Sequence, residues 1–346
     1  MKATEFITLK DIAAMDIEPK GRFFSATDLE IERGLTSDIY FVRTRDLLNS
    51  LGLADTEVTA EVFSSKEGIL AGMDEALHLL RNRELDIWAL PEGSEMSAKE
   101  VVMRIRGSYS DFGVYETPLL GFLASSSGWA TAARQCKQAA GDRTVVCYGA
   151  RHLHPSVAPV MERAAVTGGA DASSCILGAL LMGRAPVGTV PHAAFLIVGD
   201  TVELAKAYDR FVPEGDPRII LVDTFKDETE DALRVAEALG SRLNGIRLDT
   251  PGERGGVTAG LVRETRARLD QAGFEHVRIV VSGGLQPERI TALAEAGADS
   301  FGVGSYIARA PAIDMTMDLK EVHGKAVAKR GRIPGIIGND RLVKVI

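Results

Sequence analysis

The chain has 346 residues, of which 45% are apolar and 25% charged, and this composition excludes a disordered, collagen-like or coiled-coil protein. The net charge of −8 has the wrong sign for a protein whose main partner is nucleic acid, although a local basic pocket for a small anion stays compatible with it. The length fits two domains, or one large α/β barrel with an addition.

Cysteine content and hydropathy predict a soluble protein of the reducing cytoplasm. Cys136, Cys147 and Cys175 are an odd number without CxxC spacing, so neither a disulfide framework nor a zinc site is indicated. Acidic residues interrupt the N-terminus, which therefore does not resemble a secretory signal. Apolar stretches such as Ile176–Met182 are far shorter than the roughly 20 residues that span a bilayer, so we expect no membrane partner.

The first third of the chain mixes helical and strand patterns. A helix is predicted over Ser37–Leu48, an alternating strand over 56–63, and a second helix over Gly68–Arg83. Residues 85–96 read as a strand followed by a turn at a Pro-Glu-Gly sequence. We interpret residues 1–122 as an α/β cap domain.

From about residue 143 the sequence alternates short β-branched runs with amphipathic segments of ten to fifteen residues. This is the pattern of repeated βα units, and six of them favour an incomplete parallel αβ barrel over an open sheet. We assign the barrel to residues 123–310, whereas the basic tail 311–346 either completes the cap domain or forms a solvated end. The six strands are expected within 143–151, 170–175, 218–225, 244–250, 276–284 and 298–305.

Polar residues follow the apolar run of nearly every predicted strand. In a parallel barrel, loops at the carboxyl ends of the strands hold the ligand, so these residues are the candidates for a site. The glycines after the last two strands either form tight turns or expose backbone N–H groups to a phosphate beside a helix N-terminus. Those loops contain Ser282, Gly283 and Gly284, and Gly302 and Gly304.

Asp223 and Asp249 each end a predicted strand and are each followed by a threonine, which is Thr224 in the first case. A carboxylate there can bind ribose hydroxyls or magnesium pyrophosphate, with the threonine hydroxyl as a further ligand. Alternatively, each aspartate caps the helix that follows it. The repeated dipeptide favours a shared role with a polyol or a metal.

The basic candidates are one arginine and three histidines. The guanidinium of Arg151 at a strand end suits a carboxylate or a pyrophosphate. His152 and His154 lack a third ligand for a metal, so they are interpreted as anion or scaffold contacts. His192 follows a turn that contains Thr189, and it either packs at a helix start or accepts a phosphoryl group as a nucleophile.

These motifs together resemble nicotinate phosphoribosyltransferase of the short bacterial and archaeal type. The resemblance runs from about residue 20 to residue 310, and its most specific parts are GTVPHA and the SGGL and FGVG pair. Two features depart from the longer members, which carry a double arginine at Arg151-His152 and a more polar sequence at 281–286. The matching motifs are TSDIYFVRT, GARHLHP, GGADASS, GTVPHA, VDTFKDE, GIRLDT, VSGGLQPERI and FGVGSYI.

The resemblance implies a type II phosphoribosyltransferase that acts as a homodimer, or a higher homo-oligomer, with shared active sites. Its reaction would join nicotinate to phosphoribosyl pyrophosphate in NAD salvage, giving nicotinate mononucleotide and pyrophosphate. Hydrolysis of ATP as co-substrate would be coupled to this reaction, and Mg²⁺ would accompany the pyrophosphate. No resident metal site formed by protein ligands is expected.

The family's roles carry over to matching positions of this chain. His192 matches the histidine that is phosphorylated from ATP, and Asp223 and Asp249 match positions near the ribose and the magnesium pyrophosphate. Arg151 matches the arginine near the nicotinate carboxylate, and Tyr40 the aromatic that covers the pyridine ring from the partner subunit. The substrate-binding set further includes His154, Thr189 and Thr224, and the 5′-phosphate cradle of Ser282, Gly283, Gly284, Gly302 and Gly304.

Two other functions stay open. Quinolinate phosphoribosyltransferase shares the fold, but its dicarboxylate substrate should need a denser lysine and arginine cluster than Arg151 and Arg247, and its chemistry needs no phosphohistidine. A non-catalytic barrel that binds a phosphorylated metabolite would keep the glycine loops but could lose His192 or the aspartates. Nicotinamide is disfavoured as the base because a neutral amide gives Arg151 no charge partner.

Overall fold

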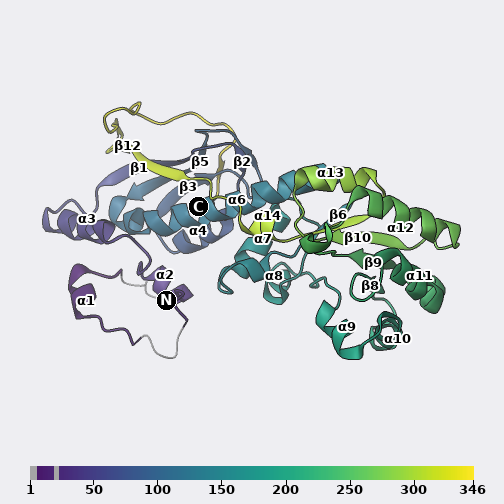
Figure 1. Ribbon diagram of the computed structural model, residues 1–346. Helices are drawn as coiled ribbons and strands as arrows, with labels where there is room; N and C mark the ends of the chain where they lie inside the picture. The colour runs from purple at the N-terminus through teal and green to yellow at the C-terminus, as the bar shows by residue number, and fades with distance from the viewer. Residues whose placement is uncertain (1–5, 19–22) are drawn as a thin grey trace. The chain divides into compact units, whose positions relative to one another are not determined.

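The computed structural model describes residues 6–18 and 23–346 and divides into two compact units (Figure 1). The N-terminal unit comprises the chain up to Thr131 together with Pro311–Ile346, and the barrel unit comprises Ala132–Ala310. The first is a mixed α/β domain and the second is built on a parallel sheet. The expected fold class is therefore confirmed.

The N-terminal unit is built on an antiparallel sheet in the order β13-β12-β1-β5-β3-β14. Strand β1 lies in the middle, and the tail supplies three of the six strands, so the tail packs on this unit. A separate pair is formed by β2 (Gly68–Ile69) and β4 (Glu95–Met96). The six strands are β1 Glu57–Ser64, β3 Leu85–Ala89, β5 Val101–Ser108, β12 Met315–Val322, β13 Lys325–Ala326 and β14 Val343–Lys344.

Alternation in 56–63 predicts a half-buried strand, yet every residue of β1 after Glu57 is buried. The polar positions are covered because the tail returns over them, as the yellow trace in Figure 1 shows. The fully buried carboxylate of Glu61 accepts a hydrogen bond from the backbone N–H of Ile337 at 3.2 Å and pairs with Arg104 at 2.8 Å. Those partners compensate for the loss of water around the charge.

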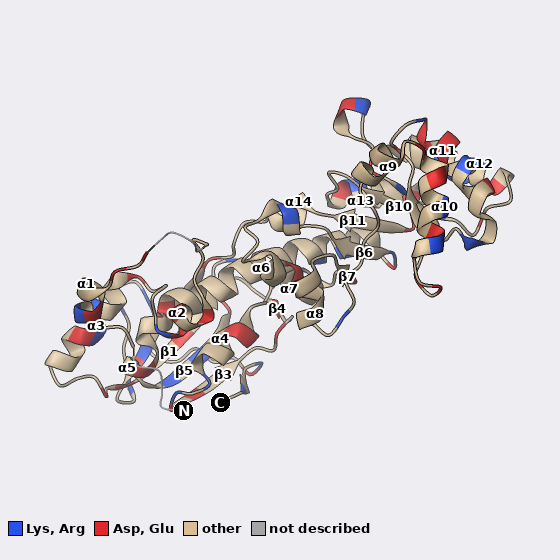
Figure 2. Cartoon of the chain, turned by 90° about the horizontal axis from the view of Figure 1, so that it is seen from below, with Lys and Arg blue, Asp and Glu red and all other residues tan. Residues whose placement is uncertain are grey.

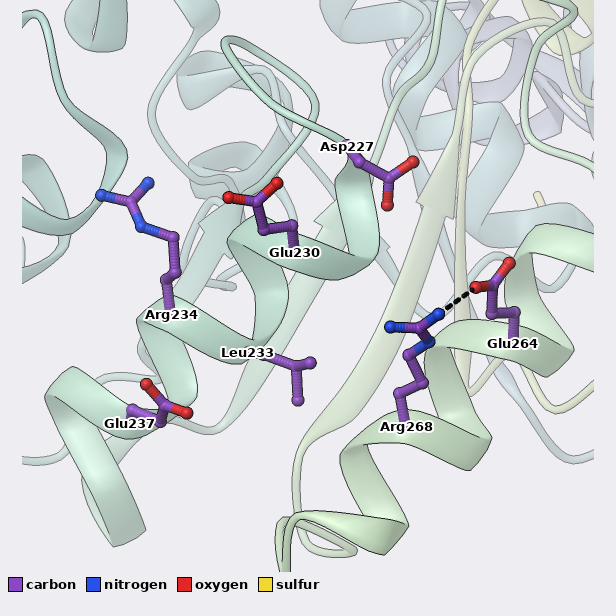
Figure 3. Close-up of a pocket in the computed structure, with 7 residues that line it drawn as sticks. All are labelled: Asp227, Glu230, Leu233, Arg234, Glu237, Glu264 and Arg268. Atoms are coloured by element: carbon purple, nitrogen blue, oxygen red, sulfur yellow. Dashed lines mark ion pairs between the residues drawn. The ribbon is translucent and has the colours of Figure 1, made fainter.

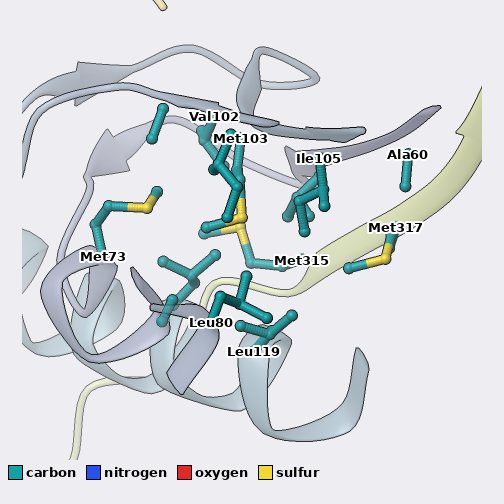
Figure 4. Packing of buried hydrophobic residues seen from close by; sticks show 14 of the residues in the cluster. Ala60, Met73, Leu80, Val102, Met103, Ile105, Leu119, Met315 and Met317 are labelled. Carbon is teal, nitrogen blue, oxygen red and sulfur yellow. The ribbon is translucent and has the colours of Figure 1, made fainter. Parts of the chain in front are cut away.

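Helices cover the opposite side of this sheet and close an apolar core (Figure 4). Met73 and Leu80 enter the core from α4, Leu119 from α6, and Met315 and Met317 from β12. Flexible thioether side chains fill the irregular space between helix and sheet. The helices of this unit are α1 Leu9–Ala14, α2 Asp28–Glu32, α3 Ile39–Ser50, α4 Met73–Leu80, α5 Tyr109–Phe112, the 3-10 turn η1 Gly113–Tyr115, and α6 Glu116–Ala140, within which the two units meet in the sequence.

The predicted helix over Gly68–Arg83 is wrong in its first turn. Gly68 and Ile69 instead form a strand, and the helix begins at Met73 after Gly72, which has a left-handed φ of +87°. A Cβ at Gly72 would lie 2.3 Å from the backbone oxygen of Phe122, so the chain can turn there only without a side chain.

The barrel unit contains six parallel strands, one in each of the six predicted segments. Their order is β7-β6-β11-β10-β9-β8, and among the described residues the two edge strands do not pair with each other, so the barrel is incomplete. Ile220 and Val281 are fully buried, as the continuous apolar runs predict. The strands are β6 Thr144–Cys147, β7 Ala172–Ser173, β8 Ile219–Leu221, β9 Gly245–Leu248, β10 Arg278–Ser282 and β11 Ser300–Val303.

Helices follow the strands of this sheet, with an extended connection of three helices between β7 and β8. None of the helices in the described part of the chain is both long and apolar enough to cross a membrane. The helices are α7 Ala158–Gly168, α8 Ile176–Leu181, α9 His192–Val198, α10 Thr201–Phe211, α11 Glu228–Leu239, α12 Ala259–Gln271, α13 Pro287–Glu295 and α14 Ser305–Ala308, with 3-10 turns η2 Ala150–His152, η3 Gly240–Arg242 and η4 Gly252–Arg254.

A pH dependence of stability is expected from Glu116, whose pKa burial raises to about 7. Between its ordinary pKa of 4.5 and about 7 the folded chain holds a proton that the unfolded chain has lost, so this group's contribution to stability falls as pH rises. Glu116→Gln should therefore raise the free energy of unfolding at pH 8 by about 1 kcal/mol, after allowance for partial exposure, and leave it nearly unchanged at pH 4.

Urea unfolding at both pH values measures this difference, and Glu67→Gln on an exposed position is the matched control. Equal effects of Glu116→Gln at the two pH values would show that the carboxyl does not titrate in this way.

Candidate functional site

Arg247 is the centre of a polar network at the carboxyl ends of β9 and β10. Its Nε donates to Ser282 Oγ at 2.9 Å, Nη2 to Asp249 Oδ2 at 3.1 Å, and Nη1 to Thr189 Oγ1 at 3.2 Å. The Ser282 hydroxyl donates in turn to Asp249 Oδ1 at 2.8 Å. Three predicted site residues from different loops are thus fixed by one guanidinium, whose side chain is 17% exposed.

An aromatic ring lies beside this cation. The Cζ atom of Arg247 is 5.3 Å from the centroid of the Tyr148 ring, which follows β6. A Cβ at Gly302 would lie 2.3 Å from that ring, and a Cβ at Gly304 would lie 3.0 Å from the Tyr148 backbone oxygen. Burial raises the pKa of the Tyr148 phenol, so the ring stays neutral beside the guanidinium. The close approach of the Tyr148 ring therefore requires glycine at Gly302, whereas a side chain at Gly304 would need the Tyr148 backbone to shift by a few tenths of an ångström.

The loop after β10 needs glycine for its backbone. Gly283 and Gly284 have φ values of +93° and +59°, and a Cβ on Gly283 would meet Asp249 Oδ1 at 3.0 Å. Both residues are exposed, and the loop leads to the nine-residue helix α13. The loop after β10 therefore both turns tightly and exposes its backbone. The loop after β11, in contrast, leads to a helix of only four residues.

The second feature of the site is a histidine–aspartate pair. His192 Nε2 lies 3.2 Å from Asp223 Oδ2, which joins the first residue of α9 to the end of β8. The Asp223 side chain is fully buried, whereas His192 is 40% exposed and open to a ligand. Burial raises the pKa of the Asp223 carboxyl, and the adjacent His192 acts in the opposite direction.

Two buried oxygens beside this pair have no hydrogen-bond partner within the described residues. They are Asp223 Oδ1 and Thr224 Oγ1. Unsatisfied buried oxygens are costly, so their presence at a strand end indicates a place where a ligand or cation completes them.

Neither strand-end aspartate caps the helix that follows it. Asp227 accepts from the backbone N–H of Thr229 at the start of α11, and Thr258 caps α12. The capping alternative is therefore wrong for both aspartates. The threonines differ, because the hydroxyl of Thr250 donates to Glu228 at 2.9 Å and is not free for a ligand.

The other predicted residues lie farther out or in the other unit. Arg151 is exposed on the turn η2, and a Cβ on Gly304 would lie 3.1 Å from Nε2 of its neighbour His152. His154 is exposed, and its Nδ1 accepts from the backbone N–H of Ser156 at 3.2 Å. Tyr40 is 55% exposed on α3 of the N-terminal unit, where its ring packs against Phe41.

Sequence reasoning missed Tyr148 as a site residue and left Arg247 outside the site. A signal existed for Arg247, because side chains two apart on a strand point to the same face. Arg247 precedes Asp249 by two residues in an otherwise apolar strand. For Tyr148 we find no such signal, since an aromatic after a strand is ordinary core composition.

A hollow between α11 and α12 is a separate feature, lined by charged side chains of both signs (Figure 3). Figure 2 shows acidic and basic positions along the helices in this part of the chain. Glu264 pairs with Arg268 at 3.1 Å, and Glu230 pairs with Lys226 at 2.6 Å. This hollow contains none of the predicted site residues. Ion pairs on a solvated surface, such as these, contribute little to stability. The strand ends are therefore the candidate site.

An α/β domain joined to an incomplete parallel barrel, with glycine loops at the strand ends, is the architecture of type II phosphoribosyltransferases. Family models for the quinolinate phosphoribosyl transferase N-terminal domain and C-terminal domain match residues 38–127 and 129–318. The chain belongs to this family.

Relatives in the family carry two different names. A nicotinate phosphoribosyltransferase of Mycobacterium tuberculosis (pncB2) is 31% identical over 304 residues, covering 82% of this chain and 64% of that protein. A second one (pncB1) is 35% identical over 71% of this chain and 55% of its own length, so the chain spans less than two thirds of both. A probable nicotinate-nucleotide pyrophosphorylase of Methanothermobacter thermautotrophicus is 24% identical over 77% of this chain and 89% of its own length.

Solved structures show the same division. The nicotinate-nucleotide pyrophosphorylase from Pyrococcus furiosus is 43% identical and superposes with a TM-score of 0.87 over 91% of this chain and 82% of its own. The human nicotinic acid phosphoribosyltransferase is 20% identical with a TM-score of 0.69, over 87% of this chain and 77% of its own, which is a likeness of fold alone.

The contact between Gly302 and Tyr148 can be tested by stability. Gly302→Ala should lower the free energy of unfolding by about 1–3 kcal/mol, because its Cβ would overlap the Tyr148 ring. Gly215→Ala is the matched control, since nothing lies within 4 Å of its Cβ position. In a Tyr148→Ala background the cost of Gly302→Ala should nearly vanish. The same cost in both backgrounds would contradict this packing.

Proposed function

We propose that this chain is a nicotinate phosphoribosyltransferase that joins nicotinate to phosphoribosyl pyrophosphate and couples the reaction to ATP hydrolysis. The observation that carries the proposal is the contact between His192 and Asp223 beside the Arg247 network. A simple displacement of pyrophosphate needs no histidine. A half-exposed histidine paired with a buried carboxylate at the strand ends suits an additional phosphoryl transfer.

The phosphoribosyl donor would occupy the strand ends of β8 to β11. The exposed backbone at Gly283 and Gly284 is suited to the 5′-phosphate, with Ser282, Gly302 and Gly304 behind it. Asp249 lies next to this loop and would contact the ribose hydroxyls. Displacement at the anomeric carbon passes through a cationic state, so the protein must mainly orient the partners and neutralise pyrophosphate.

The orphaned oxygens of Asp223 and Thr224 fit Mg²⁺, which prefers carboxylate and hydroxyl oxygens together with substrate phosphates. The ion would neutralise charge on the departing pyrophosphate. We therefore propose Mg²⁺ as a companion of the donor rather than as a metal held by the protein alone.

His192 would act through Nδ1, because its Nε2 faces Asp223. With the Nε2 proton held by the carboxylate, the Nδ1 lone pair attacks the γ-phosphorus of ATP, the bond to the bridging oxygen breaks, and ADP leaves. Water later attacks the phosphorus and releases inorganic phosphate, which returns the electron pair to Nδ1. Between these steps the bound phosphoryl group would alter how the adjacent site holds pyrophosphate.

Base recognition is proposed for Arg151, with His154 on the same loop. The exposed guanidinium of Arg151 would pair with the nicotinate carboxylate, and Thr189 would complete the site from the segment before His192. Tyr40 would cover the pyridine ring from a partner subunit.

Exposed apolar side chains on two barrel helices support a homo-oligomer, since surfaces of this kind seldom stay bare in a monomer. They are Ile176, Leu177, Leu180 and Leu181 on α8, and Leu196 and Ile197 on α9, which begins at His192. We therefore propose a homodimer, or a larger assembly, with shared sites.

The second candidate function is the transfer of the phosphoribosyl group to quinolinate with loss of carbon dioxide. It is favoured by the family models and by the 43% identity to the Pyrococcus furiosus pyrophosphorylase.

Product formation should therefore be measured with phosphoribosyl pyrophosphate, Mg²⁺ and nicotinate, quinolinate or nicotinamide, each with and without ATP. We expect turnover of nicotinate that ATP raises. Quinolinate turnover with carbon dioxide release would overturn the proposal, and no turnover of any base would favour a binding protein.

His192 should be separable from the basal reaction, whereas Asp223 should not. His192→Ala should abolish ATP stimulation while leaving slow ATP-independent turnover. Asp223→Asn should reduce stimulation about 10- to 100-fold because the proton on Nε2 then faces a neutral amide instead of a carboxylate, and it should also slow the basal reaction because Asp223 would contact the Mg²⁺ of the donor. His276→Ala, at an exposed position of the same unit, is the matched control. Wild-type ATP coupling in His192→Ala would remove the phosphohistidine from the account.

A further inference from the structure

Glu162 is a buried carboxylate on α7 that joins two loops at the strand ends. Its side chain Oε1 accepts from Ser174 Oγ at 3.0 Å, and Oε2 accepts from the backbone N–H of Cys175 at 2.6 Å. The backbone N–H groups of Ser174 and Ala150 also face this carboxylate and act to lower its pKa. The residue itself has no exposed surface.

These four donors are all neutral. Burial raises the pKa of Glu162, and the hydrogen bonds act against this rise. A buried carboxylate that is held by hydrogen bonds alone destabilises a protein unless nearly all of its acceptor positions are satisfied. The positions of the donor groups are therefore fixed as strongly as the position of the carboxylate.

The donors lie in two segments that lead to proposed site residues. Ala150 directly precedes Arg151 in the turn after β6. Ser174 and Cys175 follow β7, whose last residue, Ser173, accepts from the backbone N–H of Val187 at 2.9 Å. That bond fixes the segment leading to Thr189, the residue that contacts Arg247.

We propose that Glu162 is a positioning residue that holds the Arg151 turn and the segment leading to Thr189 and His192 in their places for base binding. This inference rests on the proposed function. Glu162 contacts no reacting group itself. It acts through the two loops, because its carboxylate is the acceptor that both share.

The test is a comparison of Glu162→Gln with wild type, using whichever pyridine acid the wild-type chain turns over. The amide has the same shape but replaces one acceptor oxygen with a donor, so one loop loses its anchor. We expect KM for the base to rise about tenfold or more while kcat changes less. The preference for the acid over nicotinamide should also fall, as we expect for Arg151→Ala, which removes the proposed partner of the base's carboxylate. Glu295→Gln, exposed on α13, is the matched control.

A purely structural role would lower the melting temperature and the active fraction but leave KM and base preference unchanged, and that result would overturn the inference. If Glu162→Gln does not fold, Ser174→Ala removes one donor and keeps the carboxylate, and it should give a smaller rise in KM. Glu162→Asp keeps the charge but shortens the reach, so it should fall between wild type and Glu162→Gln. Quinolinate turnover by wild type would remove the nicotinate assignment and leave this comparison intact.

Discussion

The site depends on a single cation, the guanidinium of Arg247, placed at the carboxyl ends of β9 and β10. Its three nitrogens bind three different side chains, and its face approaches the ring of Tyr148. A planar fork of donors can order several loops at once, which a lysine at this position could not do. Because Thr189 and Asp249 both depend on this group, the segment that carries His192 and the loop after β9 are coordinated through it.

The fold supplies the second constraint. Parallel strands bring their carboxyl ends to one edge, so Asp223, Asp249 and Ser282 become neighbours although the chain separates them by 26 to 59 residues. The site then carries two carboxylates, one arginine, a histidine and two unsatisfied oxygens. Such an arrangement suits a polyanionic ligand that binds together with a cation, because the protein's own groups would balance neither the charge of the ligand alone nor that of the cation alone. The relatives carry two kinds of name, nicotinate phosphoribosyltransferase and nicotinate-nucleotide pyrophosphorylase.

Much of this architecture could be predicted from the sequence. The buried apolar runs ending in Asp223 and Ser282 located their strands, because residues buried on both faces leave a continuous signal. The helix start at Met73 could not be found, since it depends on how closely Phe122 approaches Gly72. The role of Tyr148 depends likewise on contacts with Gly302 and Arg247 that arise only in three dimensions. Helix capping by Asp227 and Thr258 resolved an alternative that the sequence left open.

A phosphoryl group on His192 would separate nicotinate chemistry from the quinolinate alternative. The most direct measurement is to incubate the protein with γ-labelled ATP and Mg²⁺ and to map acid-labile label by peptide mass spectrometry. We expect a phosphohistidine at residue 192, modified on Nδ1, that disappears when phosphoribosyl pyrophosphate and nicotinate are added. Label elsewhere, or label that persists in His192→Ala, would contradict it.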